Sequence, residues 1–206
     1  MNGRPASSAA QCLCDVSRLL FERDLTDLCG GNVSLRDGDR IFITPTCAAE
    51  YFLWDLSAED VVVLAPDGTI LRGDKSRLSR ENDLHLRIYR TQPRIHSVFH
   101  LHTVELMLLA ERPDLLTGCL QPFLREQGIG LALLPADLVG QTPEHDDRLM
   151  ELLGRLDPAR PAVIVAPRHG IFATATDTAA NLISVDGLVC HVRQWKLVRD
   201  LVRASR

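Results

Sequence analysis

Short apolar segments typical of β-strands alternate with amphipathic helical segments along the whole chain, and tight turns join several of the strands. Residues 32–35 and 40–43 flank an Asp37-Gly38 turn, which predicts a β-hairpin. Apolar residues at helical spacing predict a helix over residues 7–28, which a double glycine at 30–31 should end. Because strands, hairpins and helices follow one another without a linker, we expect one mixed α/β domain over residues 1–206.

The remaining elements follow from the same patterns. Further strands are predicted over residues 60–64, 69–71, 95–102, 129–134, 161–166 and 170–176. Further helices are predicted over residues 80–90, 104–111 and 142–156, and over more than twenty residues after Asp177. Thr142 and Pro143 form an N-cap and a first helical position, and Asp177 should cap the last helix.

Charge and cysteine content exclude several classes of protein. The 206 residues carry 23 Lys and Arg against 27 Asp and Glu, a net charge of −4, which disfavours binding to nucleic acid or to an anionic membrane. No apolar run approaches the roughly 20 residues that span a bilayer, and the N-terminal segment lacks the apolar core of a signal peptide. The six scattered cysteines suit free thiols in a reducing compartment. We therefore expect a cytoplasmic protein.

Three histidines and one glutamate form a candidate metal site. His100 and His102 are two residues apart on a predicted strand, so both rings should point to the same face and could chelate one cation. His169 follows a strongly apolar strand and precedes Gly170, and Glu81 begins a predicted helix. Three imidazoles and a carboxylate would complete a catalytic zinc set. Read singly, His100 and His102 also fit the solvent face of a strand, and His169 also fits a turn.

Five motifs in order resemble the class II aldolase/adducin family. They comprise Gly31-Asn32-Val33-Ser34, Ile43-Thr44-Pro45-Thr46, Ser79-Arg80-Glu81 with His85 and Ile88-Tyr89, Pro93 through His100-Leu101-His102, and Arg168-His169-Gly170. The resemblance implies an α/β fold with three α/β/α layers and a largely antiparallel central sheet. It also implies a homotetramer with sites between subunits.

The same resemblance assigns roles to site residues. It implies that Glu81, His100, His102 and His169 bind the metal, zinc or another divalent ion such as Mn²⁺, Co²⁺ or Fe²⁺. Glu81 would also be the catalytic base. A substrate phosphate would be bound by Gly31, Asn32, Thr46 and Ser79, with Arg80 as a further anion ligand.

The implied activity is that of an aldolase, a carbon–carbon lyase that cleaves a small phosphorylated ketose through a metal-stabilised enediolate. Three departures from the family pattern keep alternatives open: Ala136 replaces the tyrosine that donates a proton, Cys47 replaces a glycine, and Arg80 replaces a serine. Decarboxylation of a phosphorylated keto acid, dehydration or epimerisation of a sugar phosphate, and a non-catalytic adducin-like module are the other readings.

Several further residues bear on the missing proton donor. Glu126 and Asp137 are acids that could replace the tyrosine, whereas Tyr89 should pack within its helix. His145 should face solvent, His191 should pack on the last helix, and His96 shares the strand face of His100 and could support it.

Overall fold

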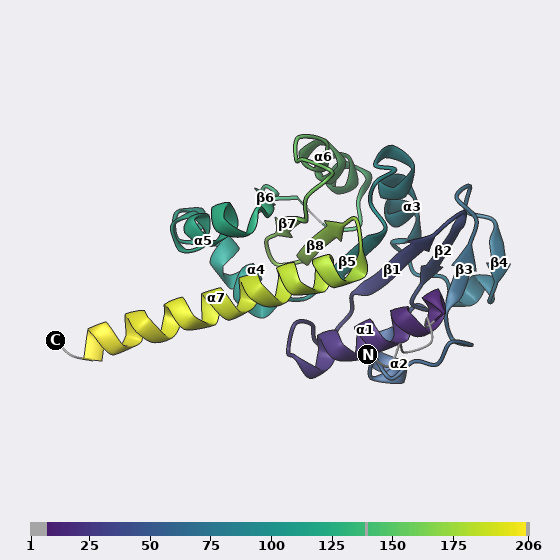
Figure 1. The fold of residues 1–206 in the computed structure, drawn as a ribbon, viewed down its shortest axis with the longest axis horizontal. Coiled ribbons are helices and arrows are strands. Elements are labelled where there is room, and N and C mark those ends of the chain that lie inside the picture. The colour runs from purple at the N-terminus through teal and green to yellow at the C-terminus, as the bar shows by residue number, and fades with distance from the viewer. Residues whose placement is uncertain (1–7, 139, 205–206) are drawn as a thin grey trace, which may run out of the picture.

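The computed structural model describes residues 8–138 and 140–204, and its centre is one eight-stranded sheet (Figure 1). The strands are β1 (Asn32–Asp37), β2 (Arg40–Ile43), β3 (Val62–Leu64), β4 (Ile70–Arg72), β5 (Ser97–Leu101), β6 (Gly130–Leu133), β7 (Ala162–Ala166) and β8 (Gly170–Ala175). They lie in the order β4-β3-β2-β1-β5-β8-β7-β6. Every pairing between these strands is antiparallel except that of β6 with β7. The largely antiparallel sheet is therefore confirmed.

Helices cover both faces of this sheet. They are α1 (Ala9–Glu22), α2 (Ala48–Phe52), α3 (Asn82–Thr91), α4 (Val104–Ala110), α5 (Pro113–Gln127), α6 (Pro143–Gly154) and α7 (Thr178–Ala204), with a short 3₁₀ turn at Lys75–Arg77. One apolar core joins α1, α4, α5 and α7 to one face, and a second joins α3 and α6 to the other. Neighbouring residues of β5 show the alternation, because Phe99 belongs to the first core and Val98 to the second. The three-layer α/β/α architecture is confirmed.

Helix α1 ends at Glu22, six residues before the predicted stop, and the predicted first residue, Ser7, lies outside the described part of the chain. Asp24 adopts a left-handed conformation with φ 54°, and Leu25 N–H bonds the carbonyl of Leu20 at 2.9 Å. This is the hydrogen-bond pattern of a Schellman cap, which usually places glycine where Asp24 lies. The double glycine at 30–31 lies in the loop before β1 instead.

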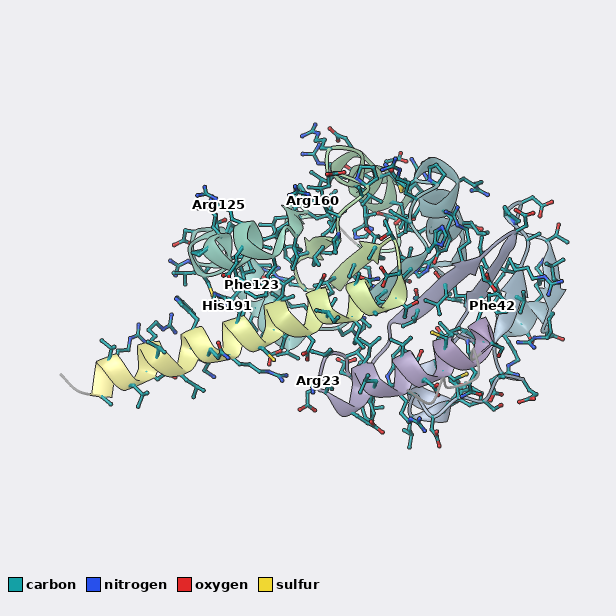
Figure 2. All side chains as sticks on the ribbon, viewed as in Figure 1. Arg23, Phe42, Phe123, Arg125, Arg160 and His191 are labelled. Atoms are coloured by element: carbon teal, nitrogen blue, oxygen red, sulfur yellow. The ribbon has the colours of Figure 1, made fainter. Side chains whose placement is uncertain are left out.

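Helix α5 was absent from the sequence prediction because Gly118 and Pro122 interrupt its helical pattern. Its buried face, formed by Leu116, Cys119 and Leu120, packs on α7. His191 of α7 stacks on Phe123 of α5 with ring centroids 5.0 Å apart (Figure 2). Its Nε2–H donates to the carbonyl of Cys119 at 2.9 Å, which confirms the packing role predicted for this histidine.

Helix α7 begins as predicted. The carboxylate of Asp177 accepts from the backbone N–H of Ala180 at 2.8 Å, as an N-cap does. The helix extends beyond the body of the molecule toward the C-terminus (Figure 1). Within residues 8–138 and 140–204, no helix is both long and apolar enough to cross a lipid bilayer.

Candidate metal centre

The predicted site lies along the edge of the sheet that is formed by the ends of its central strands β1, β5 and β8, on the face covered by α3 and α6. Asn32 opens β1 and pairs with His100 near the end of β5, and His100 pairs on its other side with Phe172 near the start of β8. His169 lies in the turn between β7 and β8, and Glu81 is the N-cap residue of α3. Because the neighbouring strands run antiparallel, two strand starts and one strand end meet at this edge.

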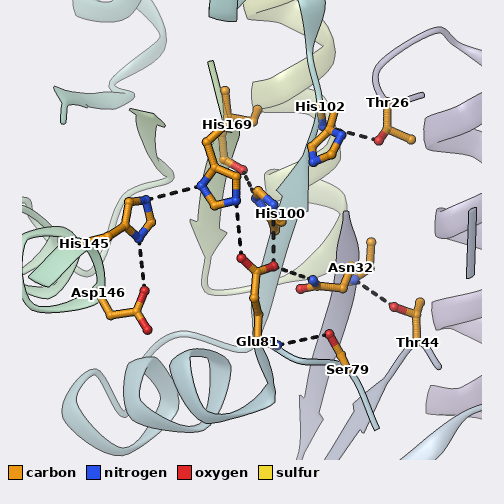
Figure 3. Close-up of polar contacts among 12 residues, drawn as sticks. Thr26, Asn32, Thr44, Ser79, Glu81, His100, His102, His145, Asp146 and His169 are labelled. Atoms are coloured by element: carbon orange, nitrogen blue, oxygen red, sulfur yellow. Dashed lines mark hydrogen bonds and ion pairs between the residues drawn. The ribbon is translucent and has the colours of Figure 1, made fainter. Parts of the chain in front are cut away.

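Glu81 is a buried carboxylate with imidazoles on two sides (Figure 3). Its Oε2 accepts a hydrogen bond of 2.6 Å from the amide of Asn32 and lies 3.5 Å from Nε2 of His100. Its Oε1 lies 3.6 Å from Nε2 of His169 and has no hydrogen-bond partner among the described residues. A buried anionic oxygen without a partner is costly, so the site favours a cation.

Each imidazole has its Nδ1 atom engaged away from Glu81. Nδ1–H of His100 donates to the carbonyl of Ile171, and Nδ1–H of His102 donates to Oδ1 of Asp27, both at 3.1 Å. Nδ1 of His169 faces Nε2 of His145 at 3.4 Å. A ring that donates from Nδ1 keeps its lone pair on Nε2, which is the usual arrangement of metal-bound histidines with their supporting partners.

Burial keeps the rings of His100 and His169 neutral. Loss of solvation lowers the pKa of His100 to about 3 and the pKa of His169 to about 4. Both rings are therefore uncharged at neutral pH, and only neutral imidazole binds a metal.

The ligand atoms of Glu81, His100 and His169 all lie within 4.8 Å of one another. Nitrogen and carboxylate oxygen donors in this number suit Zn²⁺ and related divalent ions. The ring of His102 lies beside that of His100, with centroids 5.3 Å apart, but outside this 4.8 Å group. The residues present therefore fit a divalent metal, and the part of His102 as a fourth ligand stays a prediction.

A glycine allows the close approach of the rings and the backbone. Gly170 has φ 146°, and a Cβ atom built on it would lie 2.6 Å from the carbonyl oxygen of Leu101 and 2.9 Å from the ring of His100. Any other residue would therefore push β8 away from His100.

All nine predicted site residues line one cavity of about 130 Å³. They are Gly31, Asn32, Thr46, Ser79, Arg80, Glu81, His100, His102 and His169. Arg80 is exposed and forms no ion pair with the described residues, whereas the amide of Asn32 is occupied by Glu81. The structure thus brings the residues together, and their roles in binding a phosphate stay predictions.

The prediction that His145 faces solvent was wrong. Its side chain is 1% exposed, and its ring packs against those of His169 and Phe172. A signal for this burial existed in the sequence, since His145 shares one helical stripe with the buried Leu149 and Leu153.

None of the residues expected to replace the tyrosine or to support His100 lies at the cavity. Glu126, Asp137 and His96 are exposed, and none of them lines it. Tyr89 is buried, and its hydroxyl bonds Ser34 at 2.8 Å, which confirms its packing role. Glu50, Cys47 and Gln141 line the cavity without having been predicted as site residues.

Comparison with known proteins agrees with this geometry. Residues 11–186 match the family model described as Class II Aldolase and Adducin N-terminal domain. An L-fuculose phosphate aldolase of Methanocaldococcus jannaschii is 26% identical over 176 residues, covering 84% of this chain and 87% of that protein. A sugar-phosphate aldolase of Thermotoga maritima superposes with a TM-score of 0.74 at 17% identity, covering 94% of this chain and 95% of that one.

A relative with another reaction also matches. A 3-oxo-tetronate 4-phosphate decarboxylase of Haemophilus influenzae is 35% identical over 101 residues, covering 48% of this chain and 46% of that protein. Several other curated relatives are likewise matched over less than half of their own length.

Proposed function

The chain belongs to the class II aldolase and adducin family, and we propose that it is a divalent-metal-dependent aldolase that cleaves a small phosphorylated ketose. The observation that carries the proposal is Glu81, a buried carboxylate that faces both the imidazoles and the cavity and has one unpaired oxygen.

Glu81 fits the part of the base. A divalent metal, when bound, would polarise the substrate carbonyl and acidify the neighbouring C–H bond. Oε1 of Glu81 is free to accept that proton, while the amide of Asn32 holds Oε2 and orients the carboxylate. The base and the metal ligands therefore face the same cavity.

A phosphate could bind in the same cavity. Gly31, Thr46, Ser79 and Arg80 line it and carry a backbone N–H, two hydroxyls and a guanidinium as hydrogen-bond donors. Neutral donors and one arginine suit an anion without requiring a basic protein. A three-carbon ketose fragment that carries phosphate would place its hydroxyketone toward Glu81.

The first test is exchange of a substrate proton with solvent. Zinc-loaded protein is incubated with dihydroxyacetone phosphate in D₂O, and deuterium at the hydroxymethyl carbon is followed by NMR. We expect exchange that Glu81→Gln abolishes at saturating zinc, because the amide cannot accept the proton. Glu50→Gln is the matched control, since Glu50 lines the same cavity but forms no ion pair with a histidine among the described residues.

Two results would overturn the proposal. A folded, zinc-loaded wild-type protein that catalyses no exchange would exclude proton abstraction from this ketose. A folded protein that binds no divalent metal would favour the non-catalytic module.

Decarboxylation of a phosphorylated keto acid is the second candidate. Among the described residues, the guanidinium of Arg80 forms no ion pair, and no tyrosine lines the cavity to act as the proton donor of an aldol cleavage. Ala136 is exposed outside it. Release of CO₂ from a 3-oxo acid phosphate, reduced tenfold or more by Arg80→Gln, would support this reaction over aldol cleavage.

We also propose a homotetramer and a cytoplasmic location. Exposed apolar side chains on α4 and α7, among them Leu108 (67% exposed) and Leu201 (69% exposed), offer a surface for contact between copies. All six cysteines are free thiols, which suits a reducing compartment.

A further inference from the structure

His145 is a buried histidine that contacts the candidate metal ligand His169 on the side of the ring away from Glu81. It is the third residue of α6, where the side chain of Thr142 accepts its backbone N–H at 3.3 Å and fixes the start of the helix. The ring centroids of His145 and His169 lie 5.1 Å apart at an interplanar angle of 68° (Figure 3). The side chain therefore has a defined orientation toward His169.

The hydrogen bonds of His145 have a definite direction. Oδ1 of Asp146 lies 3.0 Å from Nδ1 of His145. An ionised carboxylate can only accept, so His145 donates from Nδ1 and carries its lone pair on Nε2. That Nε2 lies 3.4 Å from Nδ1 of His169, so His169 must donate from Nδ1. The lone pair of His169 then lies on Nε2, which points to Oε1 of Glu81 at 3.6 Å.

His169 depends on this support more than the other rings do. His100 is held by a strand carbonyl and by stacking on Phe172, with ring centroids 4.3 Å apart. His169 instead lies in a turn next to Arg168, whose φ is 62°, and its side chain is 17% exposed. Gly140 packs against its ring so closely that a Cβ atom there would lie 2.5 Å from Nδ1.

We propose that His145, oriented by Asp146, is a positioning residue that fixes the tautomer and the ring orientation of His169 for a divalent metal. The inference rests on the metal-dependent function proposed above. Groups that support a metal-bound histidine in this way typically contribute about 10- to 100-fold to metal affinity.

Three variants separate this role from plain packing. His145→Leu keeps an apolar volume but removes the acceptor, whereas His145→Gln places an amide oxygen where Nε2 lies. His191→Leu removes a histidine that packs between α5 and α7, away from the site. The readouts are the zinc dissociation constant, measured by competition with a chelator, and the visible spectrum of the Co²⁺-substituted protein.

We expect His145→Leu to weaken zinc binding about 10- to 100-fold and to change the Co²⁺ spectrum. His145→Gln should restore both to near wild type, and His191→Leu should change neither. Wild-type affinity and spectrum in folded His145→Leu would overturn the inference while leaving the proposed function intact. A wild-type protein that binds neither ion would overturn both.

A measurement on the wild-type protein keeps the inference testable even where a variant fails to fold. Long-range ¹H–¹⁵N NMR of the metal-free protein at neutral pH distinguishes the two histidine tautomers. His169 should carry its proton on Nδ1, and a proton on Nε2 would overturn the inference.

Discussion

Glu81 lies among neutral imidazoles, and within the described part of the chain no lysine or arginine forms an ion pair with it. A buried carboxylate with so little compensation destabilises the metal-free fold. The same burial keeps His100 and His169 neutral, so protonated imidazoles do not supply the positive charge that a metal would bring. The buried carboxylate of Glu81 therefore lowers the free energy of unfolding of the metal-free protein. A divalent ion would raise it again, because an ion that binds only the folded state stabilises that state.

The stability of the metal-free protein should therefore depend on pH. Burial lowers the pKa of His85 and of His169 to about 4 and the pKa of His100 to about 3. Histidines of the unfolded chain have a pKa of about 6.5. Below that pH the unfolded state binds more protons than the folded state. The free energy of unfolding should then fall as pH falls, by up to about 1.4 kcal/mol per pH unit for each histidine.

Unfolding by urea in the presence of a chelator, between pH 7 and pH 5, measures this slope. Replacing the buried ring, as in His85→Gln, should make the slope shallower. The exposed His96 provides the control, since His96→Gln should leave the slope unchanged. A stability that is flat over this range would contradict the lowered pKa values.

Among the elements, the periodic patterns predicted most of the strands and helices near the site, but not how each element ends. The boundary of α1 depends on the left-handed conformation of Asp24. The usual sequence signal for this conformation is a glycine, and none is present at that position. Helix α5 forms although it contains Pro122, because its apolar face is buried against α7. His145 shows the same limit at the site: the sequence predicted its helix, but the face buried against His169 depends on how α6 packs on the sheet.

Cys47 lies in the turn that leads into α2, and its backbone conformation leads to a prediction about stability. This residue has φ 56° and ψ 34°, a left-handed conformation. A residue with a Cβ atom adopts this conformation at a cost in free energy, whereas glycine adopts it without that cost. Relief of this strain should raise the free energy of unfolding of Cys47→Gly by up to about 1 kcal/mol, after the entropy cost of glycine. Cys47→Ala is the control, because alanine retains the Cβ atom, and it should bring no gain. Equal melting temperatures for the glycine and alanine variants would show that the conformation carries no strain.

For the whole molecule, the candidate site and the exposed apolar surface lie on different parts of the fold. The site occupies the edge where β1 and β8 begin, on the face covered by α3 and α6. The exposed leucines and valines at positions 197, 198, 201 and 202 lie on the last turns of α7, which extends away from the sheet (Figure 1). Burial of such a surface favours association between copies.

Charges on this part of α7 should prevent that association. We expect the Leu197→Glu, Leu201→Glu double variant to sediment as a smaller species than the wild type, because four carboxylates or more would be buried in a symmetric assembly. Leu71→Glu is the control: Leu71 is 53% exposed on β4, at the opposite end of the sheet order from β6. Analytical ultracentrifugation gives the comparison, and a wild-type protein that is monomeric at micromolar concentration would contradict the tetramer.

The edge where Asn32, Glu81, His100 and His169 meet also bears on the lifetime of folded molecules. These residues come from segments that are far apart in the chain, so the edge consists of non-local contacts, which form slowly during folding. An ion bound there would act as a cross-link between β5, the β7–β8 turn and the start of α3, and unfolding would have to break it. The metal would then confer kinetic stability, and the rate of irreversible inactivation would follow the rate of metal loss.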